Sequence, residues 1–274
     1  MDTSLIHSCH LGPEISSEKL IPEHFFMYLL KGSMTAYDGR NTYTIRQGQA
    51  IVARKYHLIR YSKQKEDNVF DRIVIALDEA FLRLFLQRHS VRSTLSAYGD
   101  SLMGVKDSIK IRNYISSLAP YQNGFGAIEE GFTDVKREEL LLILLKENPE
   151  LSGILFNFGA PQKIDLEAFM NRNFRFNVGL NQFAFLTGRS LSAFKRDFHL
   201  LFNTTPGNWL TGRRLEEAYF QILNGNKNPG EVYLEVGFEN QSHFSWAFKK
   251  RFGRSPAELL GERQAVSGQK MGSR

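Results

Sequence analysis

The chain has 274 residues, 42% of them hydrophobic and 12% aromatic, which is enough to build folded cores and excludes a chain that is disordered throughout. Its single cysteine, Cys9, excludes an internal disulfide and a zinc site built from several thiolates. The net charge of +6 lies entirely after residue 160, because the residues before it carry equal numbers of acidic and basic side chains, so only the C-terminal part is expected to bind a polyanion.

The first part of the chain reads as short strands separated by turns. Apolar runs and turn residues alternate between His24 and Leu77, and they predict about six strands. Strands this close in sequence are typical of an antiparallel β-barrel or sandwich. A barrel of this kind can hold a small ligand, although a filled core is the alternative. The residues that would line such a ligand pocket are Tyr28, Tyr43, His57 and Arg60.

Helical periodicity begins at Asp78, which is expected to cap a helix carrying Phe81, Leu82, Phe85 and Leu86 on one face. Two further helices are predicted over 108–118 and 136–147. Residues 140–145 of the last one are all apolar. Such a helix is either buried in its own domain or covered by a second copy of the chain.

A linker composition at 157–161 separates the chain into two expected domains. Residues 1–160 form the first, residues 161–260 form the second, and residues 261–274 are expected to be a flexible tail. The second domain contains a repeat, because a triad of phenylalanines spaced four residues apart recurs fifty positions later. Each triad predicts the buried stripe of a helix and is followed by a Thr-Pro or Ser-Pro pair. The triads are Phe194, Phe198 and Phe202, then Phe244, Phe248 and Phe252.

A short apolar segment and a glycine turn precede each triad, at Gly188 in the first repeat and Gly237 in the second. Helix, glycine turn and second helix make a helix-turn-helix unit. Between the two units, Thr205 and Pro206 are expected to open a connecting helix of about 18 residues, or about 27 Å. That length can hold two helices roughly one DNA turn, about 34 Å, apart.

Residues 190–206 and 236–256, which include the run Val-Gly-Phe-Glu-Asn-Gln-Ser-His-Phe, resemble the DNA-binding domain of the AraC/XylS family of bacterial regulators. The front of the chain is similar to the cupin-like regulatory domain of that family. Residues 81–88 and 179–198 are similar to the type III secretion activators within it. The resemblance implies an α+β fold, in which a cupin-like antiparallel β-barrel with trailing helices precedes an all-α double helix-turn-helix domain. It also implies a transcription activator that binds double-stranded promoter DNA as a homodimer, contacts RNA polymerase, and responds to a small-molecule effector or a regulatory protein.

The family places the second helix of each unit, residues 190–202 and 240–252, in the major groove. The side chains opposite the phenylalanine stripes are then the expected DNA contacts: Ser190, Ser192, Lys195, Arg196, His199, Gln241, Ser242, Ser245, Trp246 and Lys249. Arg196 is expected to pair with guanine, and Gln241 is suited to adenine. Trp246 stands where the family often has arginine, and Tyr233 replaces a usual alanine. The first unit is therefore expected to read more of the sequence than the second.

Enzyme motifs are absent from the sequence, which has no glycine-rich phosphate loop and no Gly-x-Ser-x-Gly. His24 and His57 stand apart, without the His-x-His pair of a cupin metal site, so no catalytic residue, metal or cofactor is expected. The alternative is a cupin-type metal-dependent isomerase or dioxygenase with an accessory DNA-binding domain. No stretch approaches the roughly 20 apolar residues that span a bilayer, and no signal peptide is evident. We therefore expect a cytoplasmic protein without a membrane partner.

Overall fold

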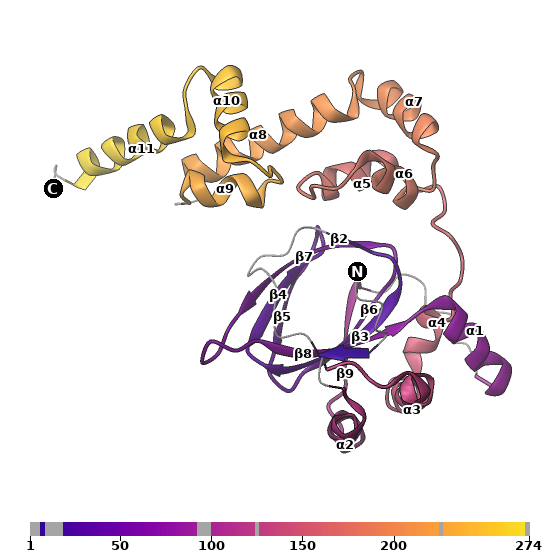
Figure 1. The fold of residues 1–274 in the computed structure, drawn as a ribbon. Helices are drawn as coiled ribbons and strands as arrows, with labels where there is room; N and C mark the ends of the chain where they lie inside the picture. Colours follow the sequence, from indigo (N-terminus) through magenta and orange to yellow (C-terminus); the bar gives the residue numbers. More distant parts are fainter. Residues whose placement is uncertain (1–5, 9–18, 92–99, 124–125, 225–226, 272–274) are drawn as a thin grey trace. The chain divides into compact units, whose positions relative to one another are not determined.

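The computed structural model describes residues 6–8, 19–91, 100–123, 126–224 and 227–271 of the chain. The chain divides into two compact units, Met1–Ala160 and Pro161–Arg274 (Figure 1). The first combines β-sheets with helices, and the second is helical over its described residues. This is the α+β fold that the sequence predicted.

Two antiparallel sheets form the base of the N-terminal unit. In spatial order, the five-stranded sheet consists of β1 (Ile6–Ser8), β8 (Asp71–Leu77), β3 (His24–Lys31), β6 (Ala50–Ala53) and β9 (Leu102–Val105). The four-stranded sheet consists of β2 (Lys19–Ile21), β7 (His57–Gln64), β4 (Ser33–Tyr37) and β5 (Thr42–Arg46). All six predicted strands are present. The extra strands β1, β2 and β9 span only three or four residues, too few to show a period-two pattern.

The five-stranded sheet is buried on both faces, because successive side chains of a strand point to opposite sides. Phe26, Val52 and Ile75 belong to the core on one face, which also contains the buried side chains of the helices. Met27 and Ile51 belong to the core shared with the four-stranded sheet. The outer strands β5 and β9 are not hydrogen-bonded to one another in the described residues, so the predicted barrel is divided into two sheets.

The described α-helices of the N-terminal unit are α1 (Glu79–Arg88), which precedes β9, and then α2 (Ile109–Ser117), α3 (Glu130–Glu147) and α4 (Ser152–Leu155). Asp78 caps α1 by accepting a hydrogen bond from the Phe81 amide at 3.0 Å, as predicted. The predicted helix at 136–147 begins earlier, at Glu130. Its Gly131 and Thr133 are weak helix formers, which hid the start from the sequence pattern.

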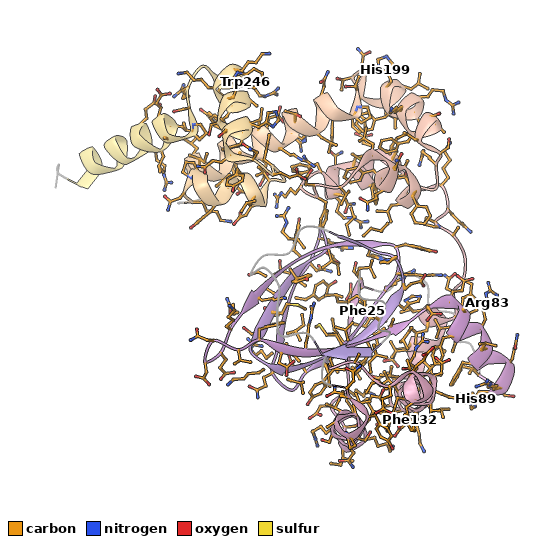
Figure 2. The ribbon with its side chains drawn as sticks, in the orientation of Figure 1. Phe25, Arg83, His89, Phe132, His199 and Trp246 are labelled. Atoms are coloured by element: carbon orange, nitrogen blue, oxygen red, sulfur yellow. The ribbon has the colours of Figure 1, made fainter. Side chains whose placement is uncertain are left out.

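Helix α3 is buried mainly within its own domain, the first of the two alternatives. Leu140, Leu141 and Leu144 have no exposed surface. Three apolar side chains of the helix are nevertheless exposed: Val135 at 63%, Leu142 at 46% and Phe132 at 42%. Phe132, near the start of the helix, is labelled in Figure 2. The helix is therefore not covered all round by this chain.

The C-terminal unit consists of helices α5 (Leu166–Asn173), α6 (Leu180–Leu186), α7 (Leu191–Phe202), α8 (Pro206–Asn224), α9 (Pro229–Glu235), α10 (Gln241–Phe252) and α11 (Pro256–Met271). Helices α6 and α7 form the first helix-turn-helix, α9 and α10 form the second, and α8 connects them (Figure 1). The connecting helix begins where predicted, with the Thr205 hydroxyl accepting from the Asn208 amide at 3.4 Å.

The expected tail is different in the structure, since residues 261–271 belong to α11. A capping box starts this helix. The Glu258 amide donates to the Ser255 hydroxyl at 3.2 Å, and the Ser255 amide donates to the Glu258 carboxylate at 2.6 Å. This reciprocal cap, followed by Pro256 at the first helical position, favours a helix in a segment without an apolar pattern.

Candidate nucleic-acid interface

The two phenylalanine triads form the same scaffold twice. Phe194, Phe198, Phe244 and Phe248 are all fully buried. Successive rings contact along each helix, with centroids 5.7 and 4.4 Å apart in α7 and 5.6 and 4.7 Å apart in α10. One aromatic ring from α8 packs against the last phenylalanine of each triad. The Trp209 centroid lies 4.9 Å from that of Phe202, and the Tyr219 centroid lies 4.8 Å from that of Phe252. Because this face of each helix is buried, the opposite face of α7 and α10 is presented to solvent.

Glycine is required in both turns. Gly188 and Gly237 adopt positive φ angles of 65° and 96°, which side chains disfavour. A Cβ atom at Gly188 would lie 2.3 Å from the carbonyl carbon of Gln162, and one at Gly237 would lie 2.4 Å from the carbonyl oxygen of Arg175. Each turn therefore passes too close to neighbouring backbone for any side chain: the first packs against the segment at Gln162 before α5, and the second against Arg175 after α5.

Hydrogen-bonded caps determine where both outward-facing helices begin. The Ser190 hydroxyl accepts from the Ala193 amide at 3.3 Å, so this predicted contact residue is also the N-cap of α7. Asn240, which the sequence interpretation did not single out, caps α10 by accepting from the amides of Ser242 and His243. Asn240 Oδ1 already accepts two hydrogen bonds, whereas the Ser190 hydroxyl accepts one and keeps a second lone pair. The Ser190 hydroxyl proton and the Asn240 amide group are still able to donate to DNA.

The outward face of α7 is basic and exposed, as predicted, and it carries Ser192, Lys195, Arg196 and His199. The Arg196 side chain is 69% exposed, and its Nη2 lies 3.2 Å from the Asp197 carboxylate. Asp197 also accepts from Arg189 at 3.1 Å and pairs with Lys163 at 3.4 Å. The Arg189 hydrogen bond, with those from Arg196 and Lys163, lowers the pKa of Asp197. An ionised carboxylate thus holds Arg196 from one side, and within the described part of the chain no other acceptor is hydrogen-bonded to its guanidinium.

The outward face of α10 differs in chemistry. Gln241, Ser242, Trp246 and Lys249 are exposed, whereas Ser245 is half-buried and therefore less accessible than predicted. Trp246 exposes 62% of its surface (Figure 2). Lys250 Nζ lies 4.9 Å from the centroid of the Trp246 ring, and the His243 ring stacks near it at 6.4 Å. Lys250 was missed because it lies beside the predicted stripe; its spacing of four residues from Trp246 was the available signal.

The two helix-turn-helix units are joined by contacts around the middle of α8. Arg214 donates to the carbonyl oxygens of Phe174 and Phe176 at 2.8 and 2.7 Å. Its Nε also lies beside the turn at Gly237. Asn177 donates to Glu239 at 2.7 Å, which adds a second link between the first unit and the turn of the second. With 19 residues, α8 is about 28 Å long, close to the pitch of B-DNA.

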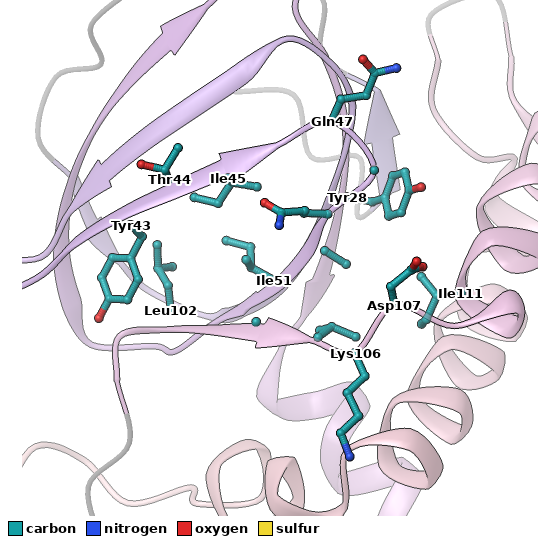
Figure 3. Close-up of a pocket in the computed structure, with 15 residues that line it drawn as sticks. Tyr28, Tyr43, Thr44, Ile45, Gln47, Ile51, Leu102, Lys106, Asp107 and Ile111 are labelled. Carbon is teal, nitrogen blue, oxygen red and sulfur yellow. The ribbon is translucent and has the colours of Figure 1, made fainter.

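The N-terminal unit contains an open pocket of about 590 Å³ between the outer strands β5 and β9 (Figure 3). Two of the four predicted lining residues, Tyr28 and Tyr43, line it together with Ile45, Ile51 and Leu102. The Tyr43 hydroxyl is engaged, since it donates to Asp38 at 2.9 Å, and burial raises its pKa to about 12.

The other two predicted residues, His57 and Arg60, do not line this pocket. Both lie on β7, which is an inner strand of the four-stranded sheet, between β2 and β4, whereas the pocket lies at the outer strand β5. His57 Nδ1 instead donates to the Lys55 carbonyl at 2.9 Å. Within the described ranges, no group of three or more His, Cys, Asp or Glu side chains is placed to hold a metal ion.

Comparison with known proteins matches both units to described families. Residues 24–154 match the ExsA N-terminal regulatory domain, and residues 183–262 match a helix-turn-helix domain. The chain is 27% identical over 252 residues to the thermoregulatory protein LcrF of Yersinia pestis, which covers 88% of this chain and 90% of LcrF. It is 24% identical over 266 residues to the HTH-type transcriptional regulator ExsA of Pseudomonas aeruginosa, which covers 92% of this chain and 91% of ExsA.

Among solved structures, the apo form of a ToxT variant from Vibrio cholerae strain SCE256 aligns with a TM-score of 0.43 and 15% identity, covering 93% of this chain and 96% of that one. The relatives named above are regulators, and none of them supports the alternative of a metal-dependent enzyme. Of the helices that the structure describes, none has the length and apolar character needed to cross a bilayer.

Proposed function

Because the chain belongs to the AraC/XylS family of transcription regulators, we propose that it binds promoter DNA sequence-specifically and activates transcription. The observation that carries this function is the duplicated helix-turn-helix, in which two copies of one aromatic scaffold present α7 and α10 on a common connecting helix. We infer that α7 and α10 enter successive major grooves on one side of the duplex. The cytoplasm, where a regulator meets its promoters, is the proposed location.

The two helices have different proposed roles on DNA. Arg196 is the proposed base reader of α7, because its guanidinium fork matches guanine O6 and N7. Lys195, Ser190, Ser192 and His199 are assigned to the phosphate backbone or the groove edge around it. In α10, Gln241 is the proposed base contact. Ser242, Ser245, Trp246 and Lys249 are proposed to hold the backbone, with the exposed Trp246 ring against sugars or thymine methyl groups.

A footprint on target promoters is expected to show protection of two successive major grooves on one DNA face. This result follows from the two helices that α8 holds about one helical turn apart. Hydroxyl-radical cleavage measures the protection at single-nucleotide resolution. Protection of one groove only, with α10 variants unchanged in affinity, would contradict the proposed role of the second unit.

An Arg196→Ala variant is expected to lose about 1–3 kcal/mol of binding free energy at its target site and to accept any base pair at one position. Competition binding against a library randomised at each position measures both effects. Arg172→Ala is the matched control, because this exposed arginine lies on α5 and outside both outward faces. An equal loss of affinity for all sequences would show instead that Arg196 contacts phosphate.

We also propose that the N-terminal unit forms a homodimer and receives a signal. The exposed apolar side chains of α3, Phe132, Val135 and Leu142, support the dimer because a second copy would cover them. The pocket between β5 and β9 supports a small-molecule effector, with a regulatory protein as the other possible signal. Activation also requires contact with RNA polymerase. Sedimentation velocity should show a dimer at micromolar concentration, and a Val135→Glu variant should be monomeric.

A further inference from the structure

Two cations extend into the core between the two sheets of the N-terminal unit. Lys63 lies on β7 and shares its inward face with Ile59 and Tyr61, while Arg72 lies on β8 and shares its inward face with Val74. Lys63 is only 8% exposed, and Arg72 is half-buried. The two side chains come from opposite sheets, so they approach the same space from both sides.

The surroundings of the two cations are aromatic and apolar. Lys63 Nζ lies 5.2 Å from the Phe70 ring and 5.9 Å from the Tyr61 ring. The Arg72 guanidinium carbon lies 6.0 and 5.3 Å from the same two rings. Arg72 Nη1 points at the sulfur atoms of two methionines, Met27 and Met34, at 3.9 and 4.0 Å, and its buried Nε donates to no described atom. Ring faces attract cations but do not cancel their charge.

The other buried cations of this unit each have a carboxylate partner. Lys55 pairs with Glu79 at 3.2 Å, Lys136 with Glu139 at 3.0 Å, and Arg137 with Asp78 and with Asp134. Lys63 and Arg72 have no such partner among the residues that the structure describes. An uncompensated buried charge is strongly destabilising, and two like charges beside the same rings add repulsion. A bound anion would remove both penalties.

We propose that Lys63 and Arg72 bind an oxyanion, the carboxylate or phosphate group of a small metabolite. Arg72 would donate through Nε and its fork, and Lys63 would supply the second charge. The backbone packs tightly beside these rings: a Cβ atom at Gly32, in the turn between β3 and β4, would lie 2.6 Å from the Gln64 carbonyl oxygen and 3.1 Å from the Phe70 ring. Arg72 is half-buried, so part of its side chain remains in contact with solvent. That the anion is the regulatory signal rests on the proposed function, whereas its binding does not.

Thermal unfolding of the full chain tests this site, with inorganic phosphate and hexanoate as probes at an ionic strength held constant with sodium chloride. Circular dichroism follows the sheets of the N-terminal unit. Tryptophan fluorescence follows the C-terminal unit alone, because Trp209 and Trp246 are the only tryptophans of the chain. One probe at ten times its dissociation constant is expected to raise the midpoint of the N-terminal unit by about 3–6 °C. A response to phosphate alone identifies a phosphate ligand, and a response to hexanoate alone identifies a carboxylate.

Substitutions locate the response. Lys63→Met and Arg72→Met should each abolish the anion-dependent shift and raise the midpoint without anion, because a buried charge is removed. Lys63→Arg should retain the shift, and it serves as the comparison if either methionine variant does not fold. Lys31→Met is the matched control, since this cation near the same turn is 35% exposed and paired with Asp67. Its shift should equal that of the unmodified chain.

The site is overturned if neither probe raises the midpoint above chloride alone, or if Lys63→Met and Arg72→Met respond like the unmodified chain. Promoter affinity measured in the same preparations keeps the two proposals apart. Promoter binding without any anion response overturns this site and leaves the proposed function in place. An anion response without promoter binding does the reverse. An anion response that leaves promoter affinity and transcription unchanged overturns the signalling role.

Discussion

A Gly237→Ala variant is expected to unfold its C-terminal unit at least about 10 °C below the unmodified chain. The alanine Cβ would lie 2.4 Å from the Arg175 carbonyl oxygen and 3.0 Å from Arg214 Nε, at a φ of 96° that side chains rarely adopt. Strain of this kind, together with the displaced backbone, is expected to cost at least about 3 kcal/mol. In a unit of about 100 residues, that loss corresponds to the stated shift in the midpoint. Tryptophan fluorescence on heating measures it.

Gly253→Ala separates the two causes of this loss. Gly253 also has a positive φ, 75°, but apart from its chain neighbours no atom of the described residues lies within 4 Å of the position where its Cβ would be. Its replacement should therefore cost only the backbone term, about 1–2 kcal/mol. Gly188→Ala, whose Cβ would lie 2.3 Å from the carbonyl carbon of Gln162, should behave like Gly237→Ala. Equal destabilisation by Gly237→Ala and Gly253→Ala would show that conformation, and not contact, makes glycine necessary in the turn.

The helical unit was largely predictable because its pattern is local. A spacing of four residues determines which side of a helix is buried, so the phenylalanine triads alone placed the outward faces of α7 and α10. The turn glycines and the Thr205 cap are local as well. The start of α11 was also predictable, since Ser255 and Glu258 have the spacing of a capping box. The helix was missed because the segment that follows has no apolar periodicity.

Features that depend on contacts between distant segments were not predictable. The sequence could not show that His57 and Arg60 lie away from the pocket at β5, because strand order, and not strand position in sequence, decides which side chains meet. The ion pairs of Asp197 are an example, because Asp197 contacts Arg196 on α7 and also Arg189 and Lys163, which lie outside that helix. The meeting of Lys63 and Arg72 requires both the facing of the two sheets and the register of each strand. A period-two pattern gives the inward side of a strand but not its partner across the core.

The free energy of unfolding of the N-terminal unit is expected to fall steeply as the pH drops below about 6.5, because of His24. This histidine is buried at the start of β3, where its Nδ1 accepts from the Lys55 amide at 3.2 Å and its Nε2 has no partner among the described residues. Burial, together with the charges of Lys55 and Arg54, lowers the pKa of His24 from 6.5 to about 3. Between those two values the unfolded chain binds a proton that the folded chain does not.

The sign follows from this difference in proton binding. Above pH 6.5 the imidazole is neutral in both the folded and the unfolded state, so the free energy of unfolding is at its full value. As the pH falls from 6.5 toward 3, only the unfolded state is protonated, and the free energy of unfolding decreases. One group contributes a slope of at most about 1.4 kcal/mol per pH unit, or about 2 kcal/mol between pH 6.5 and pH 5. Urea unfolding followed by circular dichroism, with tryptophan fluorescence as the reading of the C-terminal unit, measures the slope.

His24→Asn tests the assignment, because the asparagine Oδ1 takes the position of Nδ1 as acceptor for the Lys55 amide and does not titrate. The variant is expected to be less stable at pH 7, because it lacks the imidazole ring in the core. Between pH 6.5 and pH 5, however, its free energy of unfolding should fall by about 2 kcal/mol less than that of the unmodified chain. His199→Asn, in the C-terminal unit, should leave the slope of the N-terminal unit unchanged. An unaltered slope in His24→Asn would mean that carboxylates, and not this imidazole, govern the acid sensitivity. Carboxylates are expected to act mainly below pH 5. Asp78 is an example, because its hydrogen bonds with Phe81 and Arg137 lower its pKa despite its burial.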